Sequence, residues 1–145
     1  MKMAKHITSP RDMERLGAVL AQRCYPGSVI YLQGELGSGK TTLARGLIRA
    51  LGYVGHVKSP SYTLIESYPV TNGVVHHLDL YRLKNSHELK ALGLHDYLTD
   101  QSILLVEWPE IAVHQLPKPH VRCMIEYLNS HHRQVSIEIT EAGIA

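Results

Sequence analysis

The stretch GELGSGKTT, residues 34–42, combines three glycines with one lysine and two threonines. Gly34, Gly39, Lys40 and Thr41 meet the spacing G-x-x-x-x-G-K-S/T of a phosphate-binding loop. In such a loop, backbone N–H groups and a helix N-terminus surround the phosphates, the lysine reaches the β- and γ-phosphates, and the threonine hydroxyl binds Mg²⁺. The stretch therefore predicts a site for a nucleoside triphosphate, with Lys40 also serving catalysis. The loop residues expected to contact the nucleotide are Glu35, Leu36, Gly37, Ser38, Gly39, Lys40, Thr41 and Thr42.

The segments on both sides of this loop support the same interpretation. Residues 28–33, SVIYLQ, form a short apolar run typical of a buried strand, and residues 41–52, TTLARGLIRALG, place apolar residues at helical spacing. Gly52 stands where a helix commonly ends. A strand, a glycine-rich loop and a helix thus follow one another in the required order. The alternative is an ordinary glycine turn ahead of a helix.

Two carboxylates end apolar runs farther along the chain, since Asp79 follows VVHHL and Glu107 follows ILLV. Ligands of open α/β sheets bind at the carboxyl ends of strands, so we expect the neighbours of Gly34, Asp79 and Glu107, which each end an apolar strand, to share one crevice. Mg²⁺ prefers oxygen ligands, and we assign Glu107 to it together with Thr41. Asp79 would orient or deprotonate the attacking water, or hold the metal through a water. Alternatively, either acid caps a strand or pairs with Arg82.

Trp108 is the only tryptophan and directly follows Glu107. Along a strand it would face away from that acid, and it is either a core residue or a catalytic wall of the crevice. Residues 59–63, SPSYT, lie between the loop's helix and the next strand, where switch segments of phosphate-loop proteins lie. Their hydroxyls could sense the γ-phosphate, and a solvated loop is the alternative.

Helices are predicted in two further places. Ser9 and Pro10 are typical of a helix start after a short extended stretch, and apolar residues follow at helical spacing as far as Cys24. Later, Ser86 resembles an N-cap and Gly93 a break, which together predict two short helical turns.

Strands account for most of the remaining chain. Residues 62–70 and 74–81 predict a β-hairpin around a short Asn-Gly turn, and residues 102–108 predict a nearly continuous apolar strand. Residues 121–128 and 133–140 predict a closing hairpin. Strands interleaved with helices, plus two β-hairpins, indicate the α/β class. We expect a three-layer fold like that of P-loop NTPases, with a mixed sheet.

The whole chain, residues 1–145, is 44% hydrophobic and carries a formal net charge of +2. This length suits one domain, and the charge is too small to indicate a nucleic-acid surface. Cys24 and Cys123 lack C-x-x-C spacing, which favours reduced core residues over a disulfide. Neither a signal-peptide pattern nor an apolar run of about 18 residues occurs. We therefore expect a single soluble domain in the cytoplasm, without membrane contact.

Ten histidines raise the possibility of a metal site, with neighbouring pairs at His76/His77 and His131/His132. Adjacent residues on a strand point to opposite faces, so neither pair is expected to chelate a metal from one side. Solvated or core imidazoles are the simpler interpretation.

Five segments, in order and over nearly the whole chain, resemble the bacterial TsaE family, also called YjeE. They are GELGSGKTT, VKSPSYTLIESY, HHLDLYRL, ELKALGLHDYL and LLVEWPE. The first is shared with many ATPases, whereas SPSYTL, DLYRL and EWPE together are specific. The resemblance implies a small ATPase that supports formation of threonylcarbamoyladenosine beside the anticodon of tRNAs. It also implies ATP hydrolysis that is weak alone and coupled to a complex with TsaD and TsaB. TsaD would carry the transferase chemistry, and tRNA would be reached through the complex.

The resemblance also assigns roles to residues. It implies that Lys40 and Thr41 hold phosphate and magnesium, that Glu107 is the second magnesium ligand, and that Asp79 and Trp108 matter for turnover of ATP.

Two parts of the sequence fit the family pattern less closely. The family usually has threonine where Ser61 stands, which keeps a hydroxyl but loosens its rotamer. It commonly places an arginine near the turn of the last hairpin, and Arg133 matches that position with a shift of about one residue. The resemblance further implies a contact from the turn at Ser9 and Pro10 to the adenine.

Two other functions share such a loop. A small-molecule kinase usually adds an arginine-bearing lid, whereas only Arg82 lies between Asp79 and Glu107. A GTPase-like binding switch would need an N-K-x-D guanine signature, which the chain lacks. With the predicted elements placed, 145 residues leave little room for an acceptor pocket. We therefore expect water to receive the γ-phosphate.

Overall fold

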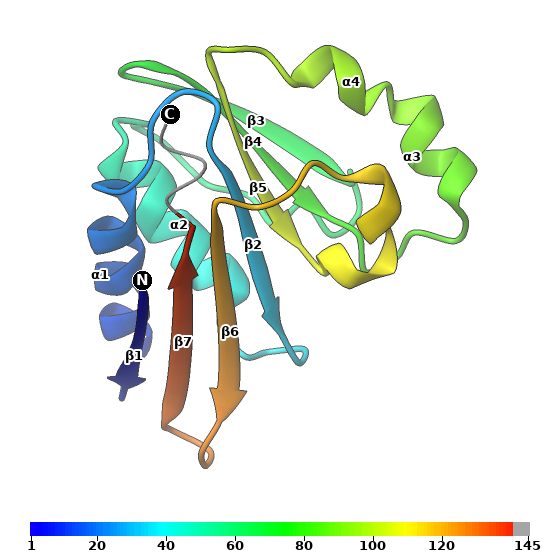
Figure 1. Ribbon diagram of the computed structural model, residues 1–145. Coiled ribbons are helices and arrows are strands. Elements are labelled where there is room, and N and C mark those ends of the chain that lie inside the picture. Colours follow the sequence, from blue (N-terminus) through cyan, green and yellow to red (C-terminus); the bar gives the residue numbers. More distant parts are fainter. Residues whose placement is uncertain (141–145) are drawn as a thin grey trace.

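The computed structural model describes residues 1–140, apart from the side chain of Ser86, and is built around a seven-stranded sheet (Figure 1). The order of the strands across the sheet is β1-β7-β6-β2-β5-β4-β3. The strands are β1 (Lys2–Ile7), β2 (Val29–Gly34), β3 (Ile65–Val70), β4 (Gly73–Asp79), β5 (Ser102–Glu107), β6 (Val121–Tyr127) and β7 (Arg133–Ile139). Strands β6, β2, β5 and β4 run parallel, while β3–β4 and β6–β7 are antiparallel hairpins. The predicted mixed sheet and both predicted hairpins are confirmed.

The helices lie on both faces of the sheet, which gives three layers (Figure 1). The helical elements are α1 (Pro10–Ala21), α2 (Lys40–Ala50), α3 (Ser86–Leu92), α4 (Leu94–Tyr97) and the 3₁₀ turns η1 (Pro109–Ile111) and η2 (Val113–Gln115). Helices α1 and α2 pack together on one face, and α3, α4 and the 3₁₀ turns pack on the other. The predicted α/β fold of three layers is therefore present.

Strand β2 illustrates why the centre of the sheet reads as a continuous apolar run. Ile30 and Leu32 belong to the core beneath α1 and α2, whereas Val29 and Tyr31 belong to the core on the opposite face. Alternate residues of a strand point to opposite faces, so a central strand covered on both sides must be apolar throughout. The phosphate-binding loop therefore begins from a fully buried strand.

Two helix starts were predicted from capping residues, and one of them was wrong by a residue. The Oγ of Ser9 accepts a hydrogen bond from the backbone N–H of Asp12 at 3.1 Å, and Pro10 opens α1 as predicted. For α3, the N-cap is Asn85 rather than Ser86. Its Oδ1 accepts hydrogen bonds from the backbone N–H groups of the second and third helical residues, at 3.0 and 3.3 Å. Both asparagine and serine are good N-caps, so the pattern alone did not fix the register.

The first arm of the β3–β4 hairpin is shorter than predicted. Strand β3 begins at Ile65, and residues 60–63 form a turn closed by a hydrogen bond from the N–H of Leu64 to the carbonyl of Pro60, at 2.8 Å. Leu64 has a φ of 71°, which breaks the extended conformation. Pro69 is tolerated within β3 because this strand lies at the edge of the sheet.

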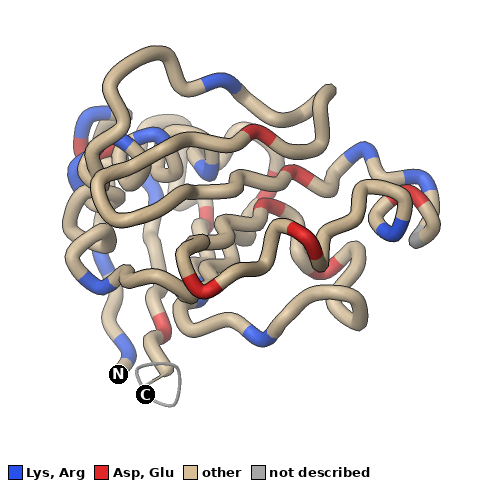
Figure 2. The backbone as a smooth tube through the Cα atoms, turned by 90° about the horizontal axis from the view of Figure 1, so that it is seen from above, with Lys and Arg blue, Asp and Glu red and all other residues tan. Residues whose placement is uncertain are grey.

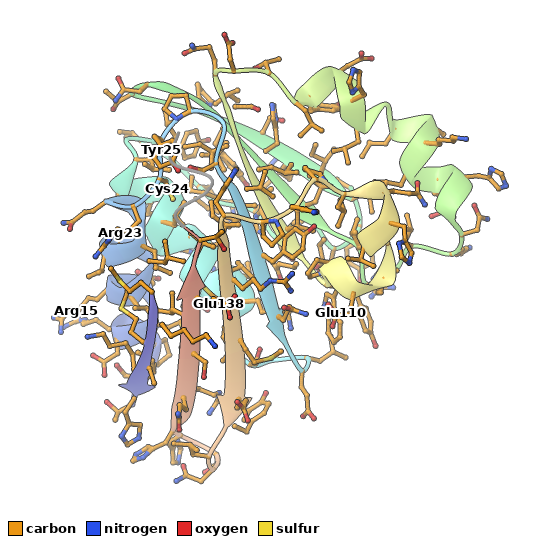
Figure 3. The ribbon with its side chains drawn as sticks, viewed as in Figure 1. Arg15, Arg23, Cys24, Tyr25, Glu110 and Glu138 are labelled. Carbon is orange, nitrogen blue, oxygen red and sulfur yellow. The ribbon has the colours of Figure 1, made fainter. Side chains whose placement is uncertain are left out.

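The outer part of the sheet is covered by α1 and α2 on one face. Val135, Ile137 and Ile139 of β7 are buried on that side, whereas Glu138 projects from the opposite side and is exposed (Figure 3). Lysine and arginine are distributed around the molecule rather than gathered on one face (Figure 2). Within residues 1–140, none of the helices has the length and apolar character needed to cross a membrane.

The two cysteines pack as predicted. Cys123 is buried in the core beneath α1 and α2, and Cys24 packs against the same core. Neither forms a disulfide in the described part of the chain. Burial raises the pKa of each thiol to about 12, so both stay protonated at neutral pH.

Candidate functional site

The carboxyl ends of β2, β4, β5 and β6 lie at one edge of the sheet, the lower edge in Figure 1. The loop that follows β2 leads into α2 at this edge. Gly39, the N-cap residue of α2, has a φ of 116°, and none of the described side chains caps the helix start. A Cβ on Gly34, whose φ is 153°, would come within 2.7 Å of the carbonyl oxygen of Ile125 and of Ser38 Oγ. The loop needs glycine at both positions, and it leaves the N–H groups of α2 open to an anion.

Lys40 is folded back onto this loop. Its Nζ donates hydrogen bonds to the carbonyl oxygens of Gly34 and Glu35, at 2.5 and 2.8 Å, and only 4% of the residue is exposed. Burial lowers the pKa of Lys40, while the nearby carboxylates of Glu107, Asp79 and Glu110 oppose that shift. The ammonium of Lys40 therefore lies near several carboxylates. It can leave the two carbonyl oxygens for phosphate oxygens, which carry more negative charge and accept stronger hydrogen bonds.

Thr41 and Glu107 meet at the start of α2 and the end of β5. Thr41 Oγ1 donates to Glu107 Oε2 at 3.0 Å, and the second carboxylate oxygen is 3.3 Å away. Two oxygens bound side by side to one octahedral Mg²⁺ lie about 2.9 Å apart, because Mg–O distances are about 2.0–2.1 Å. Both donors are hard oxygen atoms, and Glu107 is 2% exposed. The pair predicted to bind the metal fits Mg²⁺ in chemistry and in spacing.

Asp79 lies beside Glu107, because β4 and β5 pair with these two residues in register. Its Oδ1 accepts a hydrogen bond from the backbone N–H of Tyr81 at 3.0 Å, and its Oδ2 accepts one from Ser61 Oγ at 3.2 Å. The predicted shared crevice is present, lined by Asp79, Glu107 and residues that follow Gly34 in the loop, although Gly34 itself does not line it. Arg82 forms no ion pair with either acid in the described residues, so the alternative of pairing with Arg82 is wrong, whereas the hydrogen bond from Tyr81 does cap the end of β4. Arg82 lies over the ring of Tyr62 instead, 4.4 Å from the centroid.

Trp108 does not follow the strand alternation that was expected of it. Strand β5 ends at Glu107, and Trp108 has a φ of 59° and a ψ of 47°. This left-handed conformation turns the indole toward the site, where Lys40 Nζ lies 4.3 Å from the ring centroid. The geometry supports both alternatives at once, because Trp108 lines the crevice and also packs against the core on the face of α3 and α4. Glu110 follows on η1, beyond the carboxyl end of β5 (Figure 3).

Two clefts flank the phosphate-binding loop. The first, which we call the acid cleft, has a volume of about 270 Å³ and is lined by Lys40, Thr41, Ser61, Asp79, Glu107 and Trp108 together with the loop residues Leu36, Gly37, Gly39 and Thr42. The second, which we call the terminal cleft, has a volume of about 300 Å³ and is lined by Thr8, Ser9, Pro10, Met13, Ser130, His131 and Arg133 together with Ser38. Gly37, Gly39 and Thr42 line both. The phosphate-binding loop therefore lies between the two clefts, and a single nucleotide could extend from one cleft into the other.

The predicted contacts of Pro10 and Arg133 both fall in the terminal cleft. Arg133 Nε donates to the carbonyl of Ser38 at 3.3 Å, and its guanidinium lies 4.1 Å from the ring centroid of Tyr127. Tyr127 in turn donates from its hydroxyl to the carbonyl of Leu36, at 2.8 Å. The closing hairpin is thus fastened to the phosphate-binding loop.

A comparison of this sequence with known protein families agrees with the site described above. Residues 7–135 match the family described as "Threonylcarbamoyl adenosine biosynthesis protein TsaE". The chain belongs to the TsaE family. The matched range includes the phosphate-binding loop, Asp79, Glu107, Trp108 and Arg133.

Similar proteins carry the same family name. The chain is 44% identical over 99 residues to "tRNA threonylcarbamoyladenosine biosynthesis protein TsaE" of Haemophilus influenzae, a match that covers 68% of this chain and 63% of that protein. It is 34% identical over 139 residues to the protein of the same name from Bacillus subtilis, covering 94% of this chain and 85% of that one. Among solved structures, B. subtilis YdiB matches with a TM-score of 0.81 and 27% identity, over 97% of this chain and 86% of that chain. The fold is that of a P-loop NTPase, as predicted.

One residue of this TsaE site was not recognised from the sequence. His77 was considered only as a metal chelator paired with His76, whereas its Nε2 lies 2.7 Å from Glu107 Oε2. A signal was available, because His77 precedes Asp79 by two residues and so points to the same side of β4. What the sequence did not reveal is that β5 lies beside β4 and brings Glu107 to that side.

The expectation that neighbouring histidines point to opposite faces of a strand was right for His76 and His77. It does not apply to His131 and His132. His76 points away from His77 and forms a hydrogen bond with Ser67 Oγ at 2.7 Å. His131 and His132 precede β7 and lie in the turn of the hairpin, so strand alternation does not apply to them. His132 Nδ1 lies 3.2 Å from His6 Nε2. Residues 1–140 contain no group of three or more His, Cys, Asp or Glu side chains placed to hold one metal ion.

Proposed function

We propose that this chain is a Mg²⁺-dependent ATPase that acts in the biosynthesis of threonylcarbamoyladenosine on tRNAs. The observation that carries the proposal is the meeting of Lys40, Thr41, Asp79 and Glu107 at the open start of α2, with Thr41 and Glu107 in hydrogen-bond contact at 3.0 Å. Membership of the TsaE family and the printed names of its relatives support the tRNA-modification role.

Lys40 and the loop would hold the phosphates. The backbone N–H groups at the start of α2 point into the loop, and Nζ of Lys40 would leave the carbonyls of Gly34 and Glu35 for oxygens of the β- and γ-phosphates. Trp108 covers the ammonium from the other side and excludes water from it. Thr41 and Glu107 would bind Mg²⁺, which neutralises phosphate charge and polarises the bond to the γ-phosphate.

Asp79 would act on the attacking water. One carboxylate oxygen is fixed by the N–H of Tyr81, and the other faces the hydroxyl of Ser61 within the acid cleft. From there Asp79 can accept the proton of a water or orient it for attack on the γ-phosphate. The turn at residues 60–63 would report the state of the nucleotide, since Ser61 can bond either Asp79 or a γ-phosphate oxygen.

Water is the proposed acceptor. None of the described residues that line the acid cleft is an arginine, and Arg82 lies over the ring of Tyr62. The terminal cleft, on the other side of the loop, would receive the adenine and ribose between Pro10 and Arg133. We further propose that hydrolysis is weak in the isolated chain and is coupled to TsaD and TsaB in the cytoplasm, with tRNA reached through that complex.

Three measurements test the proposal. Calorimetric titration with ATP and with GTP, each with Mg²⁺ present, should show tighter binding of ATP. Phosphate release should be slow for the chain alone and faster when TsaD, TsaB and tRNA are added. Copurification from the organism's own cell extract should recover TsaD and TsaB. Transfer of the γ-phosphate to a small molecule in place of water would instead establish the kinase alternative.

A further inference from the structure

His77 occupies an unusual position for a polar side chain. It lies on β4, has no exposed surface, and makes its one side-chain hydrogen bond with Glu107, from Nε2 to Oε2 at 2.7 Å. No described group bonds to its other ring nitrogen, Nδ1. A core position filled only for packing would favour an apolar side chain, because a buried nitrogen without a partner is unfavourable. The contact with Glu107 is therefore the feature that explains a histidine here.

The direction of this hydrogen bond follows from the groups involved. An ionised carboxylate only accepts, so the proton of the bond resides on Nε2 of His77. Glu107 thus accepts from two sides, from the imidazole of β4 and from the Thr41 hydroxyl of α2. If a metal ion binds Thr41 and Glu107, the hydroxyl must turn its lone pairs to the ion, and the bond from His77 is the one that remains.

We propose that His77 is a positioning residue for the metal ligand Glu107. By fixing Oε2, it holds the carboxylate at the start of α2 with the orientation that the ion requires before nucleotide arrives. Partners of this kind, one shell outside the ligands, commonly change metal affinity by about 10- to 100-fold. This role rests on the proposed Mg²⁺ site, and it concerns binding of the metal rather than the chemical step.

The chain offers variants that separate this role from packing. His77→Gln keeps an N–H donor at nearly the same reach as Nε2, whereas His77→Leu removes the donor and keeps most of the volume. His76→Gln is the matched control, because His76 lies next to it on the opposite face and contacts Ser67 and Tyr97. Melting temperatures of all variants would establish that they are folded. If His77→Leu does not fold, His77→Asn and His77→Gln carry the same comparison.

The readout is ADP affinity measured by calorimetry, once with Mg²⁺ and once with EDTA. The ratio of the two affinities isolates the contribution of the metal. We expect His77→Leu to lower this ratio by about 10-fold or more with the EDTA value unchanged, and His77→Gln to restore much of it. The control His76→Gln should change neither value. Electron paramagnetic resonance of Mn²⁺ bound with ADP should show the same order of metal affinities.

A double-mutant cycle identifies the route of the effect. If His77 acts through Glu107, His77→Leu should cause no further loss of the Mg²⁺-dependent ratio in a Glu107→Gln background. Additive losses, an unchanged ratio in His77→Leu, or equal losses with Mg²⁺ and with EDTA would each overturn the inference. If instead the parent chain shows no Mg²⁺-dependent gain in ADP affinity, the proposed metal site itself is wrong.

Discussion

The two clefts beside the phosphate-binding loop are built in different ways. In the acid cleft, Lys40, Asp79 and Glu107 are buried, and the charged group of each is held by at least two hydrogen bonds to other parts of the chain. In the terminal cleft, Arg133 bonds mainly to backbone carbonyls, and the walls come from the first turn of α1 and the turn of the last hairpin. The acid cleft therefore holds its charged groups in fixed positions, which suits the proposed hydrolysis, whereas the terminal cleft suits the proposed binding of adenine and ribose.

The strongest test of this contrast is Asp79→Asn. The amide keeps the shape of the carboxylate but is a poor base, so hydrolysis should slow by roughly 100- to 10,000-fold while ATP remains bound. Phosphate release with and without TsaD and TsaB measures the first effect, and calorimetry the second. Hydrolysis within a few-fold of the parent would remove Asp79 from the mechanism. Sustained multi-turnover tRNA modification by a variant that cannot hydrolyse ATP would separate hydrolysis from the pathway.

Lys40→Ala should have the next largest effect, on binding. Loss of a charge-assisted contact with the phosphates should weaken ATP affinity by roughly 100-fold in calorimetric titration. Lys58→Ala, which removes a lysine outside both clefts, is the matched control. Equal ATP affinity in Lys40→Ala and the parent would contradict the phosphate-binding role of the loop.

A smaller effect is expected in the terminal cleft. Arg133→Ala removes the contacts to the loop carbonyls and a wall of the cleft, so ATP affinity should fall by about 10-fold or less. The rate of hydrolysis at saturating ATP should stay within about two-fold of the parent, because no atom of Arg133 reaches the acid cleft. Arg122→Ala, which removes an exposed arginine of β6 that lines neither cleft, is the control. A large fall in the saturated rate would show that the two clefts are not separate in function.

The smallest expected effect concerns stability and lies outside both clefts. Burial lowers the pKa of His76 below its ordinary value of 6.5, so the folded chain binds fewer protons than the unfolded chain as pH falls below 6.5. The contribution of this group to stability is therefore full above pH 6.5 and is lost progressively as the pH falls below it. His76→Gln should flatten that part of the profile in denaturant titrations between pH 7.5 and 5. An identical slope in parent and variant would exclude His76 as its source.

Local patterns explain how much of this molecule could be predicted from sequence. The phosphate-binding loop depends on residues within one short segment, and both acids end strands whose apolar runs are easily recognised. Their meeting also followed from a general property of open sheets, namely that ligands bind where parallel strands end. These features require no knowledge of which strands are neighbours.

The features that sequence missed depend on a single backbone angle, on strand order or on which of two neighbouring side chains makes a hydrogen bond. Trp108 turns into the site because the chain takes a left-handed conformation directly after Glu107, and alternation cannot anticipate that change. The role of His77 requires β4 to lie beside β5, which no local pattern specifies. The choice between Asn85 and Ser86 as the N-cap required the hydrogen bonds themselves.

The position of the terminal cleft has a consequence for the order in which the nucleotide site forms. Its walls come from segments far apart in sequence, Thr8 to Pro10 and Ser130 to Arg133, which the pairing of β1 with β7 brings together. The residues of the acid cleft, in contrast, all lie between Leu36 and Trp108. Contacts between segments far apart in sequence form slowly, so the terminal cleft should form later than the acid cleft. A nucleotide that fills both clefts would therefore stabilise the folded chain by tying these distant segments to the phosphate-binding loop.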